Sequence, residues 1–489
     1  HAASEHLKHA SHEVEGAAFI ERVGDLGGPN VVSAGFRGAA PAGGCPRPFS
    51  EGAARPGAAT GGPPAAPRAV PMPPCSSRDA VAPARALAVA AIAVAAAWVL
   101  ATPAAAQHAG APRPAVAAKA PKAAPPPLPL ETLTVAPLAP AGPKRLYLSD
   151  VALPHIVAGK LHVIDGDTLS YRGFVSTGYA GQATLSADRR RLYVATTYYT
   201  RLSRGERTDV LDVHDATTLA HDHEIVLPPK HAQALPYKGL IAVSSDDRWV
   251  FVQNATPAVS VTVVDPRARK AVQEIDTPGC WTVQPVRSRP NAFATLCGDG
   301  TILTVTVSAD GTTSTLERSA KLFDIEKDPL FVHAESDGDR LWYLSFSGVL
   351  HAVDLSGATA RAQSWPLVRG ELAREGWRPG GYQVSALHRA SGRLFVAMHR
   401  NGGEGSHKNP ADQTWTVPTK ALDTKARRVA ARSPGSAAIA IAVSQDAAPR
   451  LFAIDGAKNE LVAFDPGARM KVVGRMAQVM ETASLMEMQ

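Results

Sequence analysis

The sequence predicts an all-β protein, a seven-bladed β-propeller that follows a signal peptide and a Pro/Ala-rich linker. Two observations carry this prediction. From residue 131 to residue 489 the chain consists of short β-rich segments separated by turn residues. Within this stretch a strand–turn–strand unit recurs, and its last strand often closes on an aspartate, as at Asp165, Asp215 and Asp265, which are spaced by 50 residues. A four-stranded unit that repeats every ~40–50 residues is the sequence signature of a propeller blade.

The unit is clearest from Ala183 to Asp215, where we expect a strand, a turn at Ser186–Asp188, a strand at Leu192–Thr196, a polar loop and a strand at Val210–Val213. The last strand alternates apolar and polar side chains with the period of two that a half-buried strand requires. Serine and aspartate side chains hydrogen-bond the backbone of such turns. One unit cannot bury its apolar face alone, so it needs neighbours of the same kind.

Including this unit, the sequence contains seven copies. The other six pair Arg145–Asp150 with Leu161–Asp165, Val243–Val252 with Val261–Asp265, Phe293–Cys297 with Ile302–Val307, Arg340–Leu344 with Val349–Asp354, Arg393–Ala397 with Lys420–Asp423, and Arg450–Ile454 with Leu461–Asp465. A β-sandwich array is the alternative, but its strands would not carry this matching order of turn and aspartate-terminated strand. Between the repeats we expect at most one short helical turn, within Pro366–Arg378.

The N-terminal part of the chain differs in composition from the repeats. Residues 1–71 are rich in Ala, Gly and Pro, and the first methionine is Met72. A basic start, the apolar run Ala86–Ala101 and the A-x-A site Ala104–Ala106 predict a secretory signal peptide over 72–106. We therefore expect translation to begin near Met72, the first 71 residues to have no folded role, and the mature chain to be periplasmic. An uncleaved anchor is the alternative, although the run is short for a membrane span.

A linker joins the predicted signal peptide to the repeats. Residues 107–130 contain seven prolines in 24 residues, a composition typical of a semi-rigid, solvated spacer. The formal charge of the whole chain is +7 and is spread without a basic stripe, so composition offers no case for nucleic-acid binding.

Cys280 and Cys297 are the two cysteines expected in the mature protein, because Cys45 and Cys75 precede the predicted cleavage site. Both lie in the fourth repeat, on segments that hairpin pairing would bring close. In an oxidising compartment a disulfide is the favoured state, and closing such a loop contributes roughly 3 kcal/mol in the chain-entropy model. A redox-active pair is the alternative, but the Cys-x-x-Cys spacing is absent. We expect a structural disulfide.

The sequence lacks the motifs of a self-contained active site: it has no nucleophile elbow, no His-Glu-x-x-His zinc motif, no phosphate loop and no dinucleotide fingerprint. Asp337–Asp339 lacks the further acids of a calcium loop and is interpreted as a turn. His214, His221 and His223 are interpreted as solvated loop histidines. We therefore expect no catalytic residue, no metal and no cofactor in this chain. Three aspartates that recur at equivalent turns are interpreted as structural: Asp188, Asp246 and Asp446.

Three stretches depart from the repeat pattern: Val151–Ile156 with a proline and a histidine, the glycine-rich and aromatic Gly376–Tyr382, and Gly402–Lys408, which lengthens the sixth repeat. Loops on a rigid scaffold are where function concentrates, so these stretches are the first candidates for a functional site.

Eight segments carry a family resemblance: TTYYTRLSRGERTDVLDVHDATTL, LPPKHAQALPYKGL, FVQNATPAVSVTVVD, GCWTVQPV, LCGDG, GWRPGGY, LHRASGR and EGSHKNPA. From about Arg145 onward the chain resembles the heavy (large) subunits of the quinoprotein amine dehydrogenases. It is most similar to the aromatic amine dehydrogenase heavy chain and more distantly to the methylamine dehydrogenase heavy chain.

The resemblance implies a periplasmic α2β2 heterotetramer of two seven-bladed propellers and two light chains. It implies that the light chain carries tryptophan tryptophylquinone, and that primary amines are oxidised to aldehyde and ammonia. Electrons would pass to a small blue copper protein, azurin- or amicyanin-like. The matching cysteine pair is a disulfide in that family, which supports Cys280–Cys297. The alternative is a stand-alone periplasmic propeller that binds a ligand without catalysis; a propeller hydrolase would need a metal-binding ring of acids and histidines that the sequence does not supply.

The resemblance also implies site residues. In the family, a phenylalanine in the loop after the first blade strand stands at the mouth of the substrate channel. The corresponding position here is Leu153, with Pro154 and His155 beside it, and loss of the ring is expected to alter which amine is preferred. Candidates for light-chain contacts are Tyr198, Arg201, Arg204, Arg207, Trp377, Arg378, Tyr382, His407 and Lys408.

Overall fold

The computed structural model describes residues 136–403, 405–422, 429–467, 469–478 and 480–489. The predicted extension 1–71, signal peptide 72–106 and linker 107–130 lie outside these residues, as does Asp423. Within them, no helix has both the length and the apolar character that a membrane span requires.

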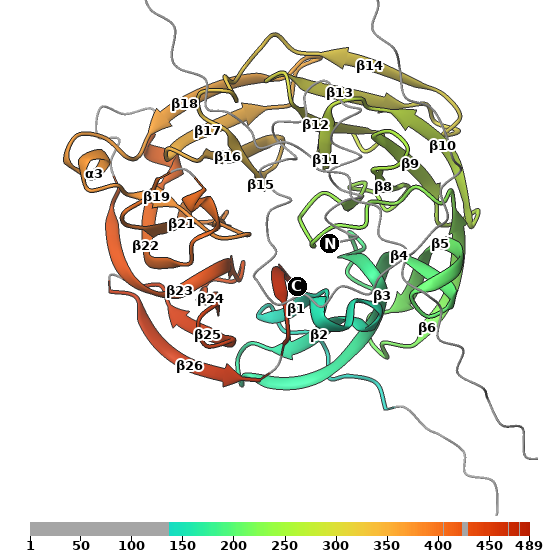
Figure 1. The fold of residues 1–489 in the computed structure, drawn as a ribbon, viewed down its shortest axis with the longest axis horizontal. Coiled ribbons are helices and arrows are strands. Elements are labelled where there is room, and N and C mark those ends of the chain that lie inside the picture. Colours follow the sequence, from blue (N-terminus) through green and yellow to red (C-terminus); the bar gives the residue numbers. More distant parts are fainter. Residues whose placement is uncertain (1–135, 404, 423–428, 468, 479) are drawn as a thin grey trace, which may run out of the picture. The chain divides into compact units, whose positions relative to one another are not determined.

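The strands form antiparallel blades set around a central axis (Figure 1). From inner to outer strand, the first blade contains β27 (Ala483–Met488), β1 (Arg145–Asp150), β2 (Gly159–Asp165) and the start of β3 (Ser170–Leu185). The second contains the end of β3, β4 (Arg191–Arg201), β5 (Arg204–Asp215) and β6 (His221–Leu227). The third contains β7 (Ile241–Val243), β8 (Val250–Asn254), β9 (Ser260–Asp265) and β10 (Lys270–Asp276).

The fourth blade contains β11 (Cys280–Pro285), β12 (Ala292–Cys297), β13 (Ile302–Val307) and β14 (Ser314–Arg318), and the fifth contains β15 (Leu330–Asp337), β16 (Arg340–Ser345), β17 (Val349–Asp354) and β18 (Arg361–Pro366). The sixth contains β20 (Ser385–His388), β21 (Arg393–His399), β22 (Ala411–Pro418) and the start of β23 (Ala431–Val443), with the short β19 (Arg378–Pro379) beside β21. The seventh contains the end of β23, β24 (Leu451–Asp455), β25 (Glu460–Asp465) and β26 (Lys471–Ala477). The predicted all-β propeller with seven blades is confirmed.

The recurring serine and aspartate residues hold the turns that the repeat pattern predicts. The Ser186 hydroxyl donates to the Asp188 carboxylate and accepts the backbone N–H groups of Arg190 and Arg191. The same arrangement recurs at Ser244–Asp246 and Ser444–Asp446. At strand ends, aspartate carboxylates accept N–H groups two or three residues further on, as at Asp165, Asp215, Asp265 and Asp455. These side chains stop one strand and start the next, which confirms their structural role.

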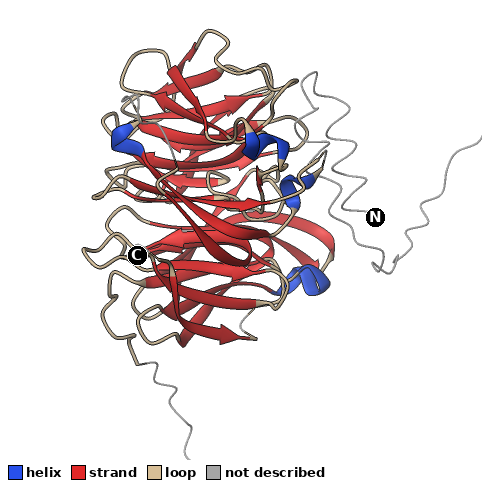
Figure 2. Ribbon diagram, turned by 90° about the vertical axis from the view of Figure 1, so that its left-hand side faces the viewer, coloured by secondary structure: helices blue, strands red, loops and turns tan. Residues whose placement is uncertain are grey.

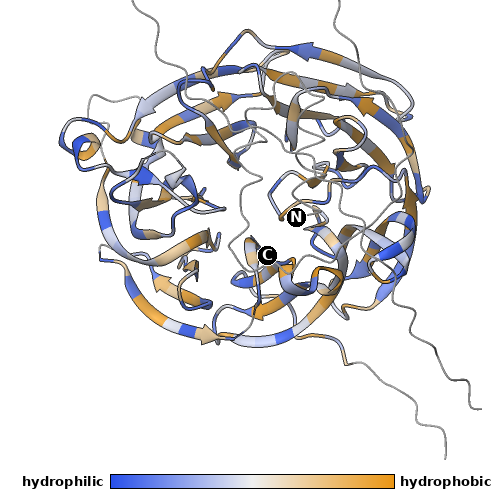
Figure 3. Cartoon of the chain, viewed as in Figure 1, coloured by the Kyte–Doolittle hydropathy of each residue, from blue (hydrophilic) through white to orange (hydrophobic). Residues whose placement is uncertain are grey.

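The hydrophobic core is divided among the junctions between blades. Seven clusters of buried apolar side chains are found in the described part of the chain, and each draws on two adjacent blades. Between the second and third blades, for example, Leu211 and Ile225 pack with Val250 and Val264. In Figure 3 the strands carry most of the apolar colour and the connections most of the polar colour. Fully burying each such side chain contributes about 1.5–3 kcal/mol, so each blade is stabilised mainly by its neighbours.

The ring is closed by a strand from the far end of the chain. β27 pairs antiparallel with β1 and becomes the inner strand of the first blade. The buried Gln383 side chain secures it: its Nε2 donates to the Met486 carbonyl at 3.2 Å, and its Oε1 accepts the Met486 N–H at 2.8 Å. Gln383 precedes β20, so these two bonds tie the first blade across the ring to the sixth.

The expected polar loop between Thr196 and Val210 is instead a β-hairpin, and that prediction is wrong. β4 and β5 remain paired up to Arg201 and Arg204, so Leu202 and Ser203 form the tip. Many side chains in this extension are exposed, so it lacks the apolar alternation by which a half-buried strand is recognised.

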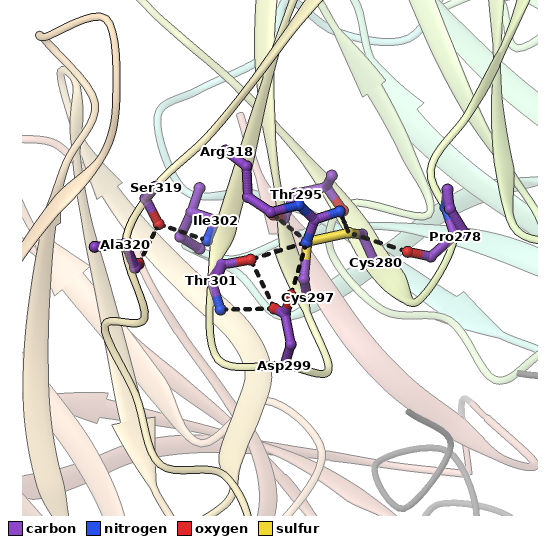
Figure 4. Close-up of a disulfide and its surroundings, with 10 residues drawn as sticks. All are labelled: Pro278, Cys280, Thr295, Cys297, Asp299, Thr301, Ile302, Arg318, Ser319 and Ala320. Atoms are coloured by element: carbon purple, nitrogen blue, oxygen red, sulfur yellow. Dashed lines mark hydrogen bonds and ion pairs between the residues drawn. A yellow bond between two sulfur atoms is a disulfide. The ribbon is translucent and has the colours of Figure 1, made fainter. Parts of the chain in front are cut away.

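The predicted disulfide between Cys280 and Cys297 is confirmed (Figure 4). The two residues lie opposite each other on β11 and β12, the inner strands of the fourth blade. Beside them, Arg318 on the outer strand β14 forms an ion pair of 3.0 Å with Asp299 and approaches the Cys280 sulfur. The disulfide therefore reinforces a sheet that backbone pairing already defines.

The alternating strand directions sort the connections onto two faces of the ring. One face, called here the variable face, carries 151–158, the hairpin tip 202–203, 228–240, 367–384 and 400–410. The other, called the turn face, carries 186–190, 244–249, 286–291, 389–392 and 444–450. The variable face holds the helical turns η1 (Leu153–Ala158), α3 (Glu371–Arg374) and η2 (Ser406–Lys408); η3 (Thr419–Ala421) belongs to the turn face. Figure 2 shows helical turns mainly along one side, and the C-terminal end at the other.

Candidate functional site

The three stretches that depart from the repeat pattern meet on the variable face. Val151–Ile156 leads into and forms most of η1, Gly376–Tyr382 follows α3, and Gly402–Lys408 includes η2. The β4–β5 hairpin tip points to the same face, because it lies at the corresponding end of its blade. The predicted site residues therefore belong to one face of the ring, although they are spread over several blades.

η1 is held in place by the buried carboxylate of Asp150. This carboxylate accepts the N–H groups of Ala152, Glu481 and Thr482 at 2.8, 2.6 and 2.8 Å, and His162 Nε2 lies 3.5 Å away. Burial alone would raise the pKa of Asp150, but these interactions outweigh burial and lower the pKa to about 2. One ionised side chain thus joins η1 to the segment that enters the closing strand.

The predicted channel residues lie in η1 at the surface. Leu153 is 45% exposed, and its backbone N–H donates to the Thr482 hydroxyl at 3.3 Å. Pro154 occupies the first turn, where its missing N–H costs nothing. His155 Nδ1 lies 3.0 Å from a Glu481 carboxylate oxygen, and both side chains are exposed. The Leu153 side chain is therefore exposed to solvent, while hydrogen bonds to Asp150 and Thr482 hold the backbone beside it.

An ion pair between the half-buried Arg207 and the buried Asp209 fixes the base of the β4–β5 hairpin. The Arg207 guanidinium makes two hydrogen bonds of 2.7 Å to the Asp209 carboxylate, which also accepts the hydroxyl of Thr197 and the backbone N–H of His231. Burial lowers the pKa of His231 to about 4, so its imidazole is neutral at neutral pH. Arg207 thereby ties the hairpin to the 228–240 connection, an interaction within this chain.

The outer part of the hairpin is displayed to solvent. Tyr198 donates its hydroxyl to the Asp212 carboxylate at 2.6 Å, and burial together with this carboxylate raises the pKa of Tyr198. Arg201 and Arg204 pair across the turn and are exposed. Leu202, which was not among the predicted site residues, is 79% exposed at the tip. The sequence signal that identifies Leu202 is its position as an isolated aliphatic residue in the polar stretch TRLSRGERTD.

The Gly376–Tyr382 segment combines a core residue with surface charges. Trp377 is 1% exposed, and its indole N–H donates to the Glu375 carboxylate at 2.7 Å. Arg400 lies over the Trp377 ring and forms an ion pair of 3.2 Å with Glu375. Arg378 donates to the Trp377 carbonyl, and the Tyr382 side chain is half-buried. The ring of Trp377 lies in the core, and Glu375 and Arg400 stand above it at the surface.

An aromatic stack occupies the same face between the fifth and sixth blades. The His407 ring lies parallel to that of Phe346 at 4.3 Å, and Phe346 contacts Phe331 at 4.8 Å. Lys408 follows His407 in η2 and is half-buried. The stack gives the sixth-blade insertion a fixed position.

The three neighbouring histidines lie on strands rather than in a loop. His214 is buried on β5, where burial lowers its pKa, and it packs edge-on against His221 of β6. His221 lies 3.2 Å from Asp212, and His223 lies 3.0 Å from Asp222. The interpretation as loop histidines is therefore wrong for all three, and of the three only His221 is exposed to solvent. Across the described ranges, no group of three or more His, Cys, Asp or Glu side chains is arranged to hold a metal ion.

Comparison with known proteins assigns a family to this arrangement. The family model for the methylamine dehydrogenase heavy chain matches residues 142–484. The chain belongs to the methylamine dehydrogenase heavy chain family. The matched residues include all the variable-face segments and every blade strand except β27, of which only the first two residues are matched.

Curated members of the methylamine dehydrogenase heavy chain family are similar over most of their length. The chain is 28% identical to the methylamine dehydrogenase heavy chain of Methylorubrum extorquens over 71% of this chain and 84% of the relative. It is 30% identical to that of Paracoccus versutus over 69% of this chain and 79% of the relative. Among solved structures, a putative 6-phosphogluconolactonase from Bacteroides uniformis superposes with a TM-score of 0.50 at 8% identity, covering 71% of this chain and 99% of that structure. This last similarity concerns the fold alone.

Proposed function

We propose that this heavy chain acts in a periplasmic quinoprotein amine dehydrogenase that oxidises primary amines to aldehyde and ammonia. In this proposal the enzyme is an α2β2 heterotetramer, and a separate light chain carries tryptophan tryptophylquinone. That group supplies the oxidising chemistry when present, and electrons leave through a small blue copper protein. The role of this chain is to hold the light chain, form one wall of the substrate channel and exclude water.

The observation that carries the proposal is the variable face. Three large apolar side chains are exposed there on adjacent blades: Leu153, Tyr198 and Leu202. η1 packs against β3, and β3 pairs with β4, so the three side chains are carried by neighbouring elements. Grouped exposed apolar residues beside charged ones, such as Arg201 and Arg204, are typical of a protein interface. A light chain that covers these residues would bury the exposed apolar side chains and contact the charged ones beside them.

The tryptophans of this chain support the assignment of the cofactor to the partner. Two indole pairs are close: Trp377 with Trp415 at 5.2 Å, and Trp342 with Trp365 at 6.2 Å. All four rings are buried, with exposed fractions of 5% or less. A redox group built from either pair could not touch a substrate, so these residues fit a role in packing.

Leu153 is proposed as the channel residue of this chain. Its exposed side chain offers an aliphatic wall, and the buried Asp150 beneath it restrains the backbone that carries it. Pro154 and His155 complete the same surface. The proposed substrate is an aromatic amine. Leu153, which stands where the family has a phenylalanine, would set the width of the mouth of the substrate channel.

Purification of the native protein tests the proposal. We expect a light chain to co-elute, with quinone absorbance and amine-dependent reduction of a dye, and we expect aromatic amines to give the higher kcat/KM. A lone colourless propeller, obtained from cells that express every neighbouring gene, would contradict the proposal and favour the stand-alone binding protein. The mature N-terminus, read by mass spectrometry, tests export: a start near residue 107 supports the periplasmic assignment.

A further inference from the structure

The central channel contains a cavity of about 210 Å³, and residues of the turn face such as Arg189, Arg287 and Arg389 form part of its lining. Its walls come from the inner strands and the turns that follow them. Six of its lining side chains carry a formal charge: Arg189, Lys238, Arg287, Glu335, Arg389 and Glu487. Four are cationic and two are anionic, so the lining side chains have an excess of positive charge.

The two carboxylates of the cavity already have cationic partners. Glu487 forms an ion pair of 3.1 Å with Arg189, and Glu335 forms one of 2.7 Å with Lys238. By contrast, the guanidinium groups of Arg287 and Arg389 make no hydrogen bond or ion pair with any residue that the structure describes. The unmatched charge among the lining residues is therefore carried by these two side chains, both of which are exposed at the edge of the cavity.

The acidic side chains of the neighbouring turns accept hydrogen bonds from the backbone, and none of them forms an ion pair with Arg287 or Arg389 within the described residues. The Asp247 carboxylate accepts the N–H groups of Ala187 and Asp188, and the Asp339 carboxylate accepts that of Ser288. Each of these bonds joins the turn of one blade to the turn of the next. Arg189 and Arg287 stand on the turns so fixed, and the backbone N–H of Arg389 donates to the Gln445 side chain.

Arg189, Arg287 and Arg389 all line this one cavity. Desolvation beside the cavity lowers the pKa of the Arg287 guanidinium, and the charges of Arg189 and Arg389 lower it further, whereas those of Glu487 and Asp339 raise it. Like charges held together at the edge of a partly enclosed cavity favour an anion between them, since its binding replaces repulsion with charge-assisted hydrogen bonds.

We propose that the turn-face mouth of the channel is a binding site for a small dianion of the size and chemistry of inorganic phosphate, held between Arg287 and Arg389 and bordered by Arg189. Each guanidinium presents a planar pair of donors that matches two oxygens of such an anion. The site lies at the opposite end of the channel from the variable face and makes no use of the light chain.

The experiment is calorimetric titration of the purified mature protein with inorganic phosphate, at constant ionic strength set with sodium chloride. We expect saturable binding of one phosphate per heavy chain, with sulfate competing. Arg287→Gln and Arg389→Gln should each weaken the affinity at least tenfold. Arg190→Gln is the matched control, because Arg190 belongs to the same turn as Arg189, is exposed and does not line the cavity.

Thermal unfolding of each variant without phosphate verifies that it is folded before its affinity is interpreted. Absence of saturable binding to the unmodified protein would overturn the proposal, and so would an equal loss of affinity in Arg190→Gln and Arg287→Gln. Either result leaves amine oxidation and light-chain association unaffected, so the site and the proposed function are tested separately.

Discussion

On the turn face, serine and aspartate side chains close the connections 186–190, 244–249 and 444–450 of three blades in the same way. On the variable face, 151–158, 228–240 and 367–384 differ in length, composition and secondary structure. Both faces are attached to the same strands, so the requirements of the sheet do not explain the difference. A fold needs only the short, repeated turns, and the irregular connections are therefore where a functional site is expected.

The variable face contains two kinds of residue that should respond differently to mutation. Asp150, Asp209 and Gln383 are buried and make several hydrogen bonds each, so they hold the face in shape. Leu153 and Leu202 are exposed, so they are available to other molecules. If the comparison is right, the first kind controls stability and the second controls association and amine preference.

The largest effect is expected from Asp150→Asn. The lowered pKa of Asp150 means that its ionised form is stabilised by folding, by about 2 kcal/mol when its pKa of about 2 is compared with the ordinary value of 3.8. This contribution is present above about pH 4 and is lost as the pH falls to about pH 2. The variant should therefore unfold at lower urea concentration at neutral pH, and the difference from the unmodified protein should shrink in acid.

Asp337→Asn is the control, since Asp337 is exposed at a turn of the opposite face. Equal stability of the two variants at neutral pH would show that the hydrogen bonds of Asp150 do not anchor the variable face.

The second effect concerns the displayed tip of the hairpin. Leu202→Asp should weaken association with the proposed light chain roughly tenfold, because a charge would replace an apolar contact at the interface. The stability of the isolated heavy chain should not change, because Leu202 is 79% exposed there. Affinity between separately prepared chains is the measurement. Val226→Asp is the matched control, a 63% exposed residue on the outer strand of the same blade; if both variants bind alike, the hairpin does not contact the partner.

A smaller effect is expected on the turn face. Ser244 is fully buried, donates to Asp246 and accepts two backbone N–H groups. Ser244→Ala should lower the free energy of unfolding by about 1 kcal/mol without altering light-chain affinity or kcat/KM. Ser308→Ala, the same motif in a more exposed turn, should have less effect. A change in light-chain affinity for Ser244→Ala would contradict the claim that residues of the turn face affect stability alone.

The smallest effect is expected from Leu153→Phe. The added ring narrows the proposed channel mouth, so the ratio of kcat/KM for aromatic and short-chain amines should shift a few-fold, on the order of 1 kcal/mol or less, while activity is retained. Val473→Phe, at a similarly exposed position on the outer strand β26, serves as the control. Unchanged ratios for Leu153→Phe would show that Leu153 does not line the channel.

The repeated parts of the molecule were predictable because their signals are local. Asp165, Asp215 and Asp265 end strands that the sequence places correctly, and Ser186–Asp188 is the turn that its residue types predict. The cysteine pair was predictable for the same reason, because one hairpin joins Cys280 to Cys297.

The unpredicted parts depend on contacts distant in sequence or on strands outside a core. Nothing local in Ala483–Met488 identifies β1 as its partner, and nothing local to Gln383 indicates that its amide secures Met486. The β4–β5 hairpin was mistaken for a loop because its tip lies beyond the blade, where both strand faces meet water. The three helical turns η1, α3 and η2 lie on one face because of the directions of the strands that they follow. These directions are known only once the strands have been assigned to blades.

Because the closing strand β27 is synthesised after all the other strands, the ring cannot close until translation has passed it. Until Ala483–Met488 have been made, β1 presents an unpaired edge and Gln383 lacks its partner, however complete the later blades are. An uncovered edge strand is a template for aggregation. A stop codon that removes Ala483–Met488 is therefore expected to leave an unclosed ring. The unpaired edge of β1 in this ring would promote aggregation.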